Sequence, residues 1–274
     1  MVFLVDNIHS IGKTHHICQD YTLSGVLTIE DNEVLFLIAA DGCSAIEHSD
    51  VGSKLLSFSA KKELKALIER RVLDNTDILQ SDDINQLGNE ILLNAISCCR
   101  ILECDYQNLF STVILSFLYK NTVHTILFGD GTYFEVDLTG NITTHTVTYN
   151  NNAPYYLYYN SSSKLKNEYL SANYGVMTVD DIEIGQIHYC YITSEADTLS
   201  KFGISTDGVS SFVETDSVGA KTLIPINQIT PTMLDIKNQS SEFLKARILK
   251  MMSRYHKKGI YHEDDLGVAL AIRK

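Results

Sequence analysis

The stretch Glu33–Ser44, EVLFLIAADGCS, joins a run apolar enough for a buried strand directly to a carboxylate and a glycine. Removing an unpaired carboxylate from water is costly, so an aspartate at the end of a core strand caps a turn, pairs with a cation or binds a metal. The pattern recurs in ILFGDG at 126–131 and FGISTDG at 202–208, and in reversed order in HEDDLGVALAI at 262–272. Asp-Gly is a common turn pair, but turn chemistry alone does not explain four apolar strands that each carry an aspartate at one end.

The bulk composition narrows the classes of partner. With 274 residues the chain could form one large domain or two small ones, and either would bury roughly 70–75% of the surface of the unfolded chain. The 34 acidic and 22 basic residues give a net charge of −12. This acidic balance argues against nucleic acid or an anionic membrane as a partner.

The sequence also carries no targeting signal that we recognise. No apolar segment reaches the roughly 20 residues that span a bilayer, and the start, MVFLVDNIHS, lacks the basic region and cleavage site of a signal peptide. We therefore expect a cytoplasmic protein. The six cysteines form no C-x-x-C pair, so we expect free thiols rather than a disulfide framework or a structural zinc site.

Runs rich in valine, isoleucine, phenylalanine and tyrosine predict the strands. These runs lie at 25–29, 33–40, 112–119, 122–129, 132–137, 186–193, 202–206 and 266–272. Very short links join several of them, for example residues 120–121 and 129–131. Because a parallel pair needs a long crossover, such links predict hairpins and antiparallel pairing.

Helical periodicity is clearest over residues 51–72, 84–102 and 241–256. The apolar face predicted for the first helix comprises Leu55, Phe58, Leu64, Leu67 and Ile68. Two helices between early and middle strands, and one just before the last strand, predict an α+β fold in which helices cover sheets. Residues 150–173 show neither period and are rich in Asn, Ser and Tyr, so we expect an insertion or flap there.

Several aspartates stand at strand ends or in tight turns, some of them beside glycine. They are Asp20, Asp41, Asp130, Asp207, Asp264 and Asp265. Hard oxygen ligands of this kind suit Mg²⁺ or Mn²⁺, and bound ions cancel repulsion that would otherwise oppose folding. An adjacent glycine lets the backbone approach closely and offers its carbonyl as a further ligand. The joint pattern therefore favours a metal site over a set of unrelated turns.

Six segments follow one another in a distinctive order. They are IGKTHHICQDY at 11–21, LIAADGCSAIEHSDVGSKLLS at 37–57, STVILSFL at 111–118, ILFGDGTYFEVD at 126–137, GISTDGVSSF at 203–212 and EDDLGVALAI at 263–272. In this order they resemble the motifs of metal-dependent serine/threonine phosphatases of the protein phosphatase 2C type, in particular a bacterial branch. The resemblance covers nearly the whole chain. It implies a single domain over residues 1–274 and a four-layer α-β-β-α sandwich, with two central antiparallel sheets flanked by helices.

The resemblance also implies a ligand set for two or three Mn²⁺ or Mg²⁺ ions. Asp41 would bridge two ions, one of which would also bind the carbonyl of Gly42, and Asp207 and Asp264 would hold the other. Asp20 would bind metal directly or through water.

Asp130, together with Asp207, would hold a third and weaker ion. The two main ions would lower the pKa of a bridging water, which attacks phosphorus in line without a covalent enzyme intermediate.

The chain departs from the family at the residue expected to bind the substrate phosphate. Relatives carry an arginine five residues before the aspartate of the opening motif, whereas this chain has His15, followed by His16. We expect these histidines to bind phosphate, with His15 among the catalytic residues; a plain surface or core histidine is the equal alternative. A histidine donates fewer hydrogen bonds and is charged only near or below its pKa. Cys43 follows the Asp-Gly pair, and we expect it to pack rather than act as a nucleophile.

The resemblance implies hydrolysis of phosphoserine or phosphothreonine in a phosphorylated protein, within a signalling circuit. The histidine in place of arginine leaves open a catalytically weak or inactive regulatory or binding protein with the same fold. A third reading is a metal-dependent hydrolase of a small phosphorylated metabolite.

Overall fold

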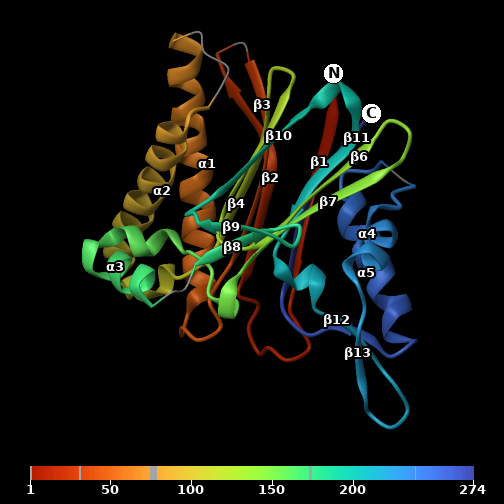
Figure 1. Ribbon diagram of the computed structural model, residues 1–274. Coiled ribbons are helices and arrows are strands. Elements are labelled where there is room, and N and C mark those ends of the chain that lie inside the picture. The colour runs from red at the N-terminus through yellow and green to blue at the C-terminus, as the bar shows by residue number, and fades with distance from the viewer. Residues whose placement is uncertain (1, 31, 75–78, 173–174, 238) are drawn as a thin grey trace.

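Two antiparallel sheets pack face to face at the centre of the molecule (Figure 1). The computed structural model describes residues 2–30, 32–74, 79–172, 175–237 and 239–274. The five-stranded sheet has the order β10-β5-β4-β3-β2, with β2 Asp20–Ile29, β3 Asn32–Asp41, β4 Val113–Tyr119, β5 Thr122–Phe128 and β10 Cys190–Glu195. The seven-stranded sheet has the order β1-β15-β11-β6-β7-β8-β9, with β1 Phe3–Ser10, β6 Gly131–Asp137, β7 Ile142–Tyr149, β8 Val176–Val179, β9 Ile182–Gln186, β11 Leu199–Ser205 and β15 Leu266–Arg273.

Helices cover the outer face of each large sheet, so the predicted four-layer sandwich is confirmed. Helices α1 (Ser49–Asp74) and α2 (Ser81–Leu102) lie on the five-stranded sheet, and α4 (Ile226–Leu234) and α5 (Phe243–His256) lie on the seven-stranded sheet. A small third sheet has the order β13-β12-β14, with β12 Phe212–Thr215, β13 Lys221–Leu223 and β14 Ile260–His262. None of the described helices is long and apolar enough to cross a membrane.

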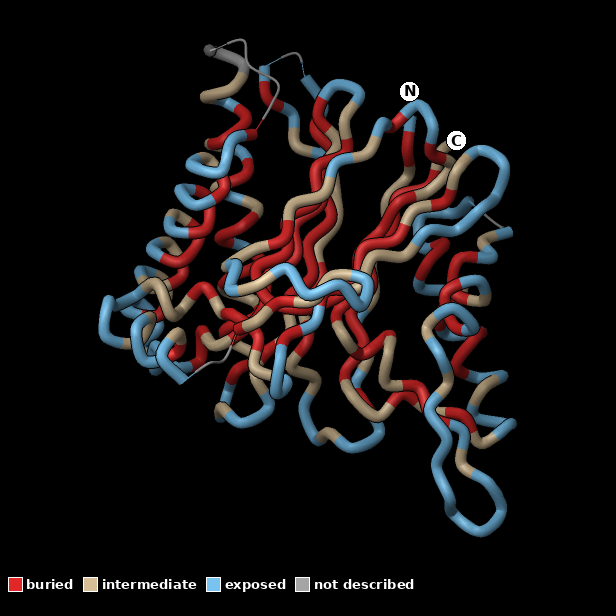
Figure 2. Tube along the Cα trace, in the orientation of Figure 1, coloured by how far each residue is buried: buried red, intermediate tan, exposed pale blue. Residues whose placement is uncertain are grey.

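The position of strand β3 explains the uninterrupted apolar run of residues 34–40. Its residues alternate between two buried layers: Val34, Phe36 and Ile38 pack toward the helices, and Leu35 and Leu37 pack between the sheets. A strand that is covered on both faces has no solvent-facing positions, so the polar alternation disappears. Figure 2 shows the resulting buried centre of both sheets.

Several local predictions need correction. Phe58 was assigned to the apolar face of the first helix, but its side chain is 53% exposed, and Leu56 is buried instead. The strand predicted over 186–193 is two strands, since β9 ends at Gln186 and β10 begins at Cys190. Residues 150–172, where neither period was clear and an insertion or flap was expected, contain the helix α3 (Ser163–Ser171); residue 173 lies outside the described residues.

The first strand also caps the last long helix. The Asp6 Oδ2 atom accepts hydrogen bonds from the backbone N–H groups of Leu244 (2.7 Å) and Lys245 (3.0 Å) in the first turn of α5. These N–H groups have no partner within the helix, and the residue before it, Glu242, makes no side-chain capping bond. Asp6 thus fixes α5 against the outer face of the seven-stranded sheet.

Replacing this cap should measurably destabilise the protein. We expect Asp6→Ala to lower the free energy of unfolding by about 1–2 kcal/mol, because two N–H groups lose their acceptor. Asp6→Asn keeps a carbonyl oxygen and should cost less than the alanine variant. Urea unfolding of the three proteins measures the difference; equal stability of wild type and Asp6→Ala would show that the cap contributes nothing.

Candidate functional site

Five polar segments that are far apart in the sequence meet at one end of the sandwich. Asp41 is the last residue of β3 and Asp20 is the first residue of β2, and the two are direct partners in the ladder. Asp130 lies in the turn between β5 and β6, Asp207 follows β11, and Asp264 precedes β15. Because these strands are antiparallel, their aspartates come to the same edge of the two sheets.

Threonines hold the Asp20–Asp41 pair in place. The Thr206 hydroxyl, from the segment after β11, donates a 2.7 Å hydrogen bond to Asp20 Oδ2 and accepts one of 2.8 Å from the Gly267 N–H group. The Asp41 N–H group donates to the Thr112 hydroxyl at 3.1 Å. Residues of both sheets therefore fix this carboxylate pair.

Glycines beside Asp130 and Asp207 allow the backbone to place these aspartates at the same edge of the sheets. Gly129 and Gly131, on either side of Asp130, have φ values of +101° and +138°, which side chains rarely tolerate. At Gly208 the reason is contact rather than conformation, because a Cβ atom there would lie 1.7 Å from the carbonyl oxygen of Asp265. The glycines of these Asp-Gly pairs thus let neighbouring backbone segments come close together at this edge.

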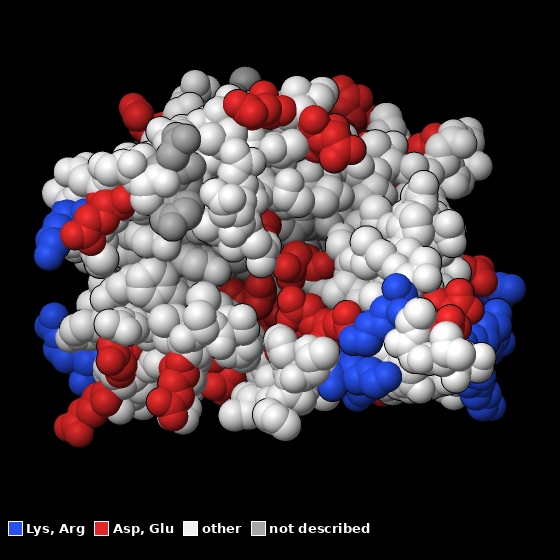
Figure 3. Space-filling model, turned by 60° about the horizontal axis from the view of Figure 1, so that its bottom comes forward, with Lys and Arg blue, Asp and Glu red and all other residues white. Residues whose placement is uncertain are grey.

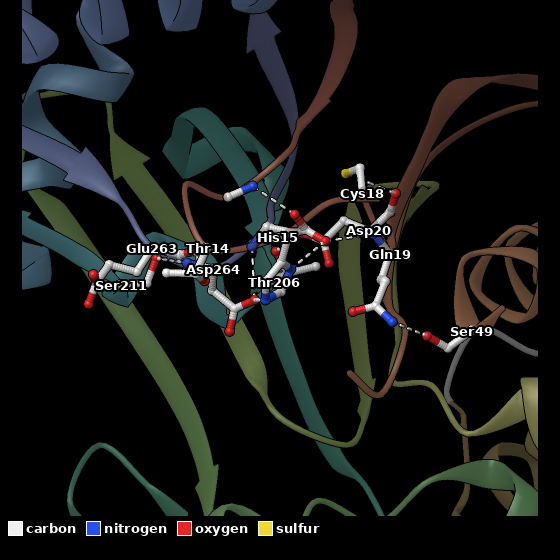
Figure 4. A network of polar contacts seen from close by, with 12 residues as sticks. Thr14, His15, Cys18, Gln19, Asp20, Ser49, Thr206, Ser211, Glu263 and Asp264 are labelled. Carbon is white, nitrogen blue, oxygen red and sulfur yellow. Dashed lines mark hydrogen bonds and ion pairs between the residues drawn. The ribbon is translucent and has the colours of Figure 1, made fainter. Parts of the chain in front are cut away.

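Asp265 and His15 form a polar network around Asp264 (Figure 4). The Asp265 side chain is only 1% exposed. It accepts hydrogen bonds from the backbone N–H groups of Gly12 at 2.7 Å and Gln19 at 2.6 Å. His15 lies with Nδ1 3.0 Å from Asp265 Oδ2 and Nε2 3.4 Å from Asp264 Oδ1. Asp265 thereby anchors the loop that carries His15.

The carboxylates line a pocket of about 200 Å³, which we call the carboxylate pocket. Its acidic residues are Asp41, Asp130, Asp207 and Asp264, and Figure 3 shows acidic side chains gathered in a hollow at the centre of this face. Tyr156 and Cys43 also line the pocket. The Tyr156 ring packs edge-on against Phe110 at 5.8 Å between centroids.

Burial and mutual repulsion raise the pKa of every aspartate for which a shift is resolved in this pocket. Burial raises the pKa of Asp20 and Asp41 well above the ordinary value, and neighbouring aspartates raise it further. For Asp130, burial and the charge of Asp207 raise the pKa to about 8. For Asp207, burial and the charge of Asp264 raise the pKa to about 6, although His15 opposes this shift. Ionised aspartates at this edge therefore need compensating positive charge.

The donor set fits a hard divalent cation. Asp20 Oδ1 is buried and has no hydrogen-bond partner, which is the condition of a free ligand atom. Within the described part of the chain, no three His, Cys, Asp or Glu side chains stand close enough to enclose an ion by themselves. Mg²⁺ usually keeps several waters and takes only one or two carboxylates directly, so the pocket is compatible with a hydrated ion.

The predicted site residues lie in three places: in the carboxylate pocket, beside it, and in a neighbouring groove. Asp41, Gly42, Asp130, Asp207 and Asp264 line the carboxylate pocket, and Asp20 lies beside Asp41. His15 contacts Asp264 from a neighbouring groove, whereas His16 is exposed and only lines that groove.

Sequence patterns assign no role to Thr206 or Tyr156. Thr206 carries no signal beyond its place in the Thr-Asp-Gly motif. Tyr156 is one of four similar tyrosines in residues 155–159, so composition could not distinguish the one that reaches the pocket.

The raised pKa of Asp130 makes the stability of the metal-free protein depend on pH. Its ordinary value is 3.8 and its folded value is about 8, so the folded state holds a proton that the unfolded state has lost between these values. Stability from this group therefore falls as pH rises through this window. In EDTA we expect Asp130→Asn to melt several degrees above wild type at pH 8 and to match it near pH 4. An advantage that shrinks with rising pH would contradict this assignment.

Comparisons with known proteins agree with this fold. No curated protein matches the sequence. Among solved structures, a bacterial serine phosphatase has a TM-score of 0.56 at 12% identity, over 98% of this chain and 97% of that one. A serine/threonine phosphatase of S. agalactiae has a TM-score of 0.56 at 13% identity, over 100% of both chains. The serine/threonine phosphatase Stp1 of Staphylococcus aureus has a TM-score of 0.54 at 12% identity, over 100% of this chain and 96% of that one. A family model described as protein phosphatase 2C matches residues 10–253, and the chain therefore belongs to the protein phosphatase 2C family.

Proposed function

We propose that the protein is a metal-dependent phosphatase that hydrolyses phosphoserine and phosphothreonine in a phosphorylated protein. The observation that carries the proposal is the convergence of Asp41, Asp130, Asp207 and Asp264 on one pocket, from elements of both sheets. Family membership supports the reaction class. We further propose that two or three Mn²⁺ or Mg²⁺ ions are the cofactor, and that the protein acts in cytoplasmic signalling as a single domain.

The chain's own residues would hold the ions and the substrate. Asp41, with the carbonyl of Gly42, and Asp20 would bind from the five-stranded sheet, and Asp207 and Asp264 from the seven-stranded sheet. Asp130 would bind from the turn that connects the two sheets. When bound, such ions neutralise phosphoryl oxygens and lower the pKa of water.

Other polar groups at the pocket would orient the substrate. Ser44, Asn152 and Tyr156 line it and carry hydrogen-bond donors suited to phosphoryl oxygens. Thr206 holds Asp20 in its orientation through the 2.7 Å hydrogen bond.

Asp41→Asn tests the central carboxylate. With Mn²⁺ present, we expect wild type to hydrolyse p-nitrophenyl phosphate and a phosphothreonine peptide, and Asp41→Asn to lose at least about 100-fold in kcat, because the ions supply several kcal/mol of charge stabilisation. Asp197→Asn is the matched control, since Asp197 is exposed and lies outside the pocket; it should keep wild-type turnover.

The same assays distinguish the competing functions. Metal binding measured by calorimetry without any turnover would contradict the proposal and leave a regulatory protein of this family. Preference for sugar phosphates or nucleotides over the phosphopeptide would instead indicate a hydrolase of small metabolites.

His15 serves in this proposal as a positioning residue for Asp264 rather than as the phosphate ligand. Its two ring nitrogens lie 3.0 and 3.4 Å from Asp265 and Asp264 carboxylate oxygens. Groups that orient a metal ligand typically contribute 10–100-fold to metal affinity.

His15→Ala separates the two roles. We expect the Mn²⁺ concentration for half-maximal activity to rise about tenfold, with little change in KM for the phosphopeptide at saturating Mn²⁺. A large increase in KM at saturating metal would show that His15 binds the phosphate, and His16→Ala in the same assay tests the neighbouring ring.

A further inference from the structure

The carboxylate pocket is too small to hold the polypeptide of a phosphoprotein. Its volume of about 200 Å³ is below the roughly 300–1,000 Å³ of pockets that enclose a drug-sized ligand. The proposed ions and the phosphoryl group take up this space. If the proposed function holds, the chain on either side of the phosphorylated residue must lie outside the pocket.

A larger groove opens beside the carboxylate pocket, and Ser44 belongs to the wall of both. The groove has a volume of about 500 Å³ and lies between the loop of residues 14–19 and the segment 44–50. We call it the loop groove. His15 also lines it while contacting Asp264, so the groove continues directly from the acidic centre.

The loop groove presents both apolar and acidic side chains. Ile17 is 57% exposed, and Ile46 lines the groove from the other segment. Glu47 also lines the groove and its side chain is 91% exposed. Ile17 and Ile46 thus place apolar surface in a groove that continues from the acidic pocket, and a polypeptide bound there buries this surface.

We propose that the loop groove binds the substrate polypeptide next to the phosphorylated residue, in an extended form, with an apolar substrate side chain packed on Ile17. This inference rests on the proposed phosphatase function and adds a sequence preference to it. Glu47 further favours a basic residue at the outer end of the bound segment. The preferred substrate is a phosphopeptide with an apolar residue close to its phosphothreonine or phosphoserine.

Two other hollows adjoin the carboxylate pocket. One, of about 460 Å³, shares Ala45 with the pocket and Ile46, Glu47 and His48 with the loop groove, so it extends that groove. The competing location is the other hollow. It shares Asp130 and Asp207 with the pocket and includes Thr148 of β7. Its volume is about 220 Å³, less than half that of the loop groove, which is why we assign the polypeptide to the loop groove.

Ile17→Asp tests the assignment through two substrates of different size. p-Nitrophenyl phosphate carries no polypeptide, whereas a phosphothreonine peptide with flanking leucines would place a leucine in the groove. We expect the ratio of kcat/KM for the peptide to kcat/KM for the small ester to fall about tenfold, mainly through KM, as burial of one isoleucine side chain would predict. The same ratio should fall in wild type when serines replace the flanking leucines.

Two matched variants complete the experiment. Leu249→Asp changes another exposed aliphatic side chain, 52% exposed on α5, and should leave the ratio at its wild-type value. An unchanged ratio in Ile17→Asp, or a fall in Thr148→Asp instead, overturns the assignment.

Absence of turnover on both substrates would refute the proposed function separately. The groove is then tested by fluorescence anisotropy of the labelled phosphopeptide with Mn²⁺. About tenfold weaker binding to Ile17→Asp than to wild type supports the groove, and equal binding overturns it.

Discussion

Crowding of buried carboxylates at one edge of the sandwich is the constraint on which the rest of the site depends. Asp20 and Asp130 are almost fully buried, at 2% and 8% exposure, and Asp41 and Asp207 lie beside them. Lost hydration and mutual repulsion raise their pKa values, so the ionised form of this edge is unfavourable for folding unless positive charge compensates it. In the proposed function, cations bound at this edge would therefore contribute to stability as well as to chemistry.

The scaffold tolerates this cost because it is held rigidly from both sheets. Strand β3 is packed on one face by helices and on the other by the second sheet, and the Asp20 carboxylate is hydrogen-bonded to Thr206 of the opposite sheet. Close approach at Gly208 keeps the Asp207 and Asp265 segments in contact. Carboxylates fixed in this way cannot move apart to relieve their repulsion, and this is the preorganisation that a site for closely spaced ions requires.

Much of this arrangement could be predicted from the sequence, because the strongest signals are local. Apolar runs that end in Asp-Gly predicted strands β3, β5 and β11 and the aspartates at their ends. Short links between the runs predicted the antiparallel pairing. Phe58 was wrongly assigned because the stripe of helix α1 that the sheet covers includes Leu56 and not Phe58. Periodicity alone did not show which of these two nearby positions is buried. The contacts of His15 and Tyr156 depend on loops that meet only in three dimensions, so neither the His15–Asp265 contact nor the approach of Tyr156 to Cys43 had a sequence signal.

Crystals grown with Mn²⁺ and measured at its anomalous absorption edge test the central claim most directly. The account predicts anomalous peaks inside the carboxylate pocket, with one peak at ligand distance from Asp41 and another shared by Asp207 and Asp264. Peaks confined to other surfaces, or an empty pocket at saturating Mn²⁺, would contradict it.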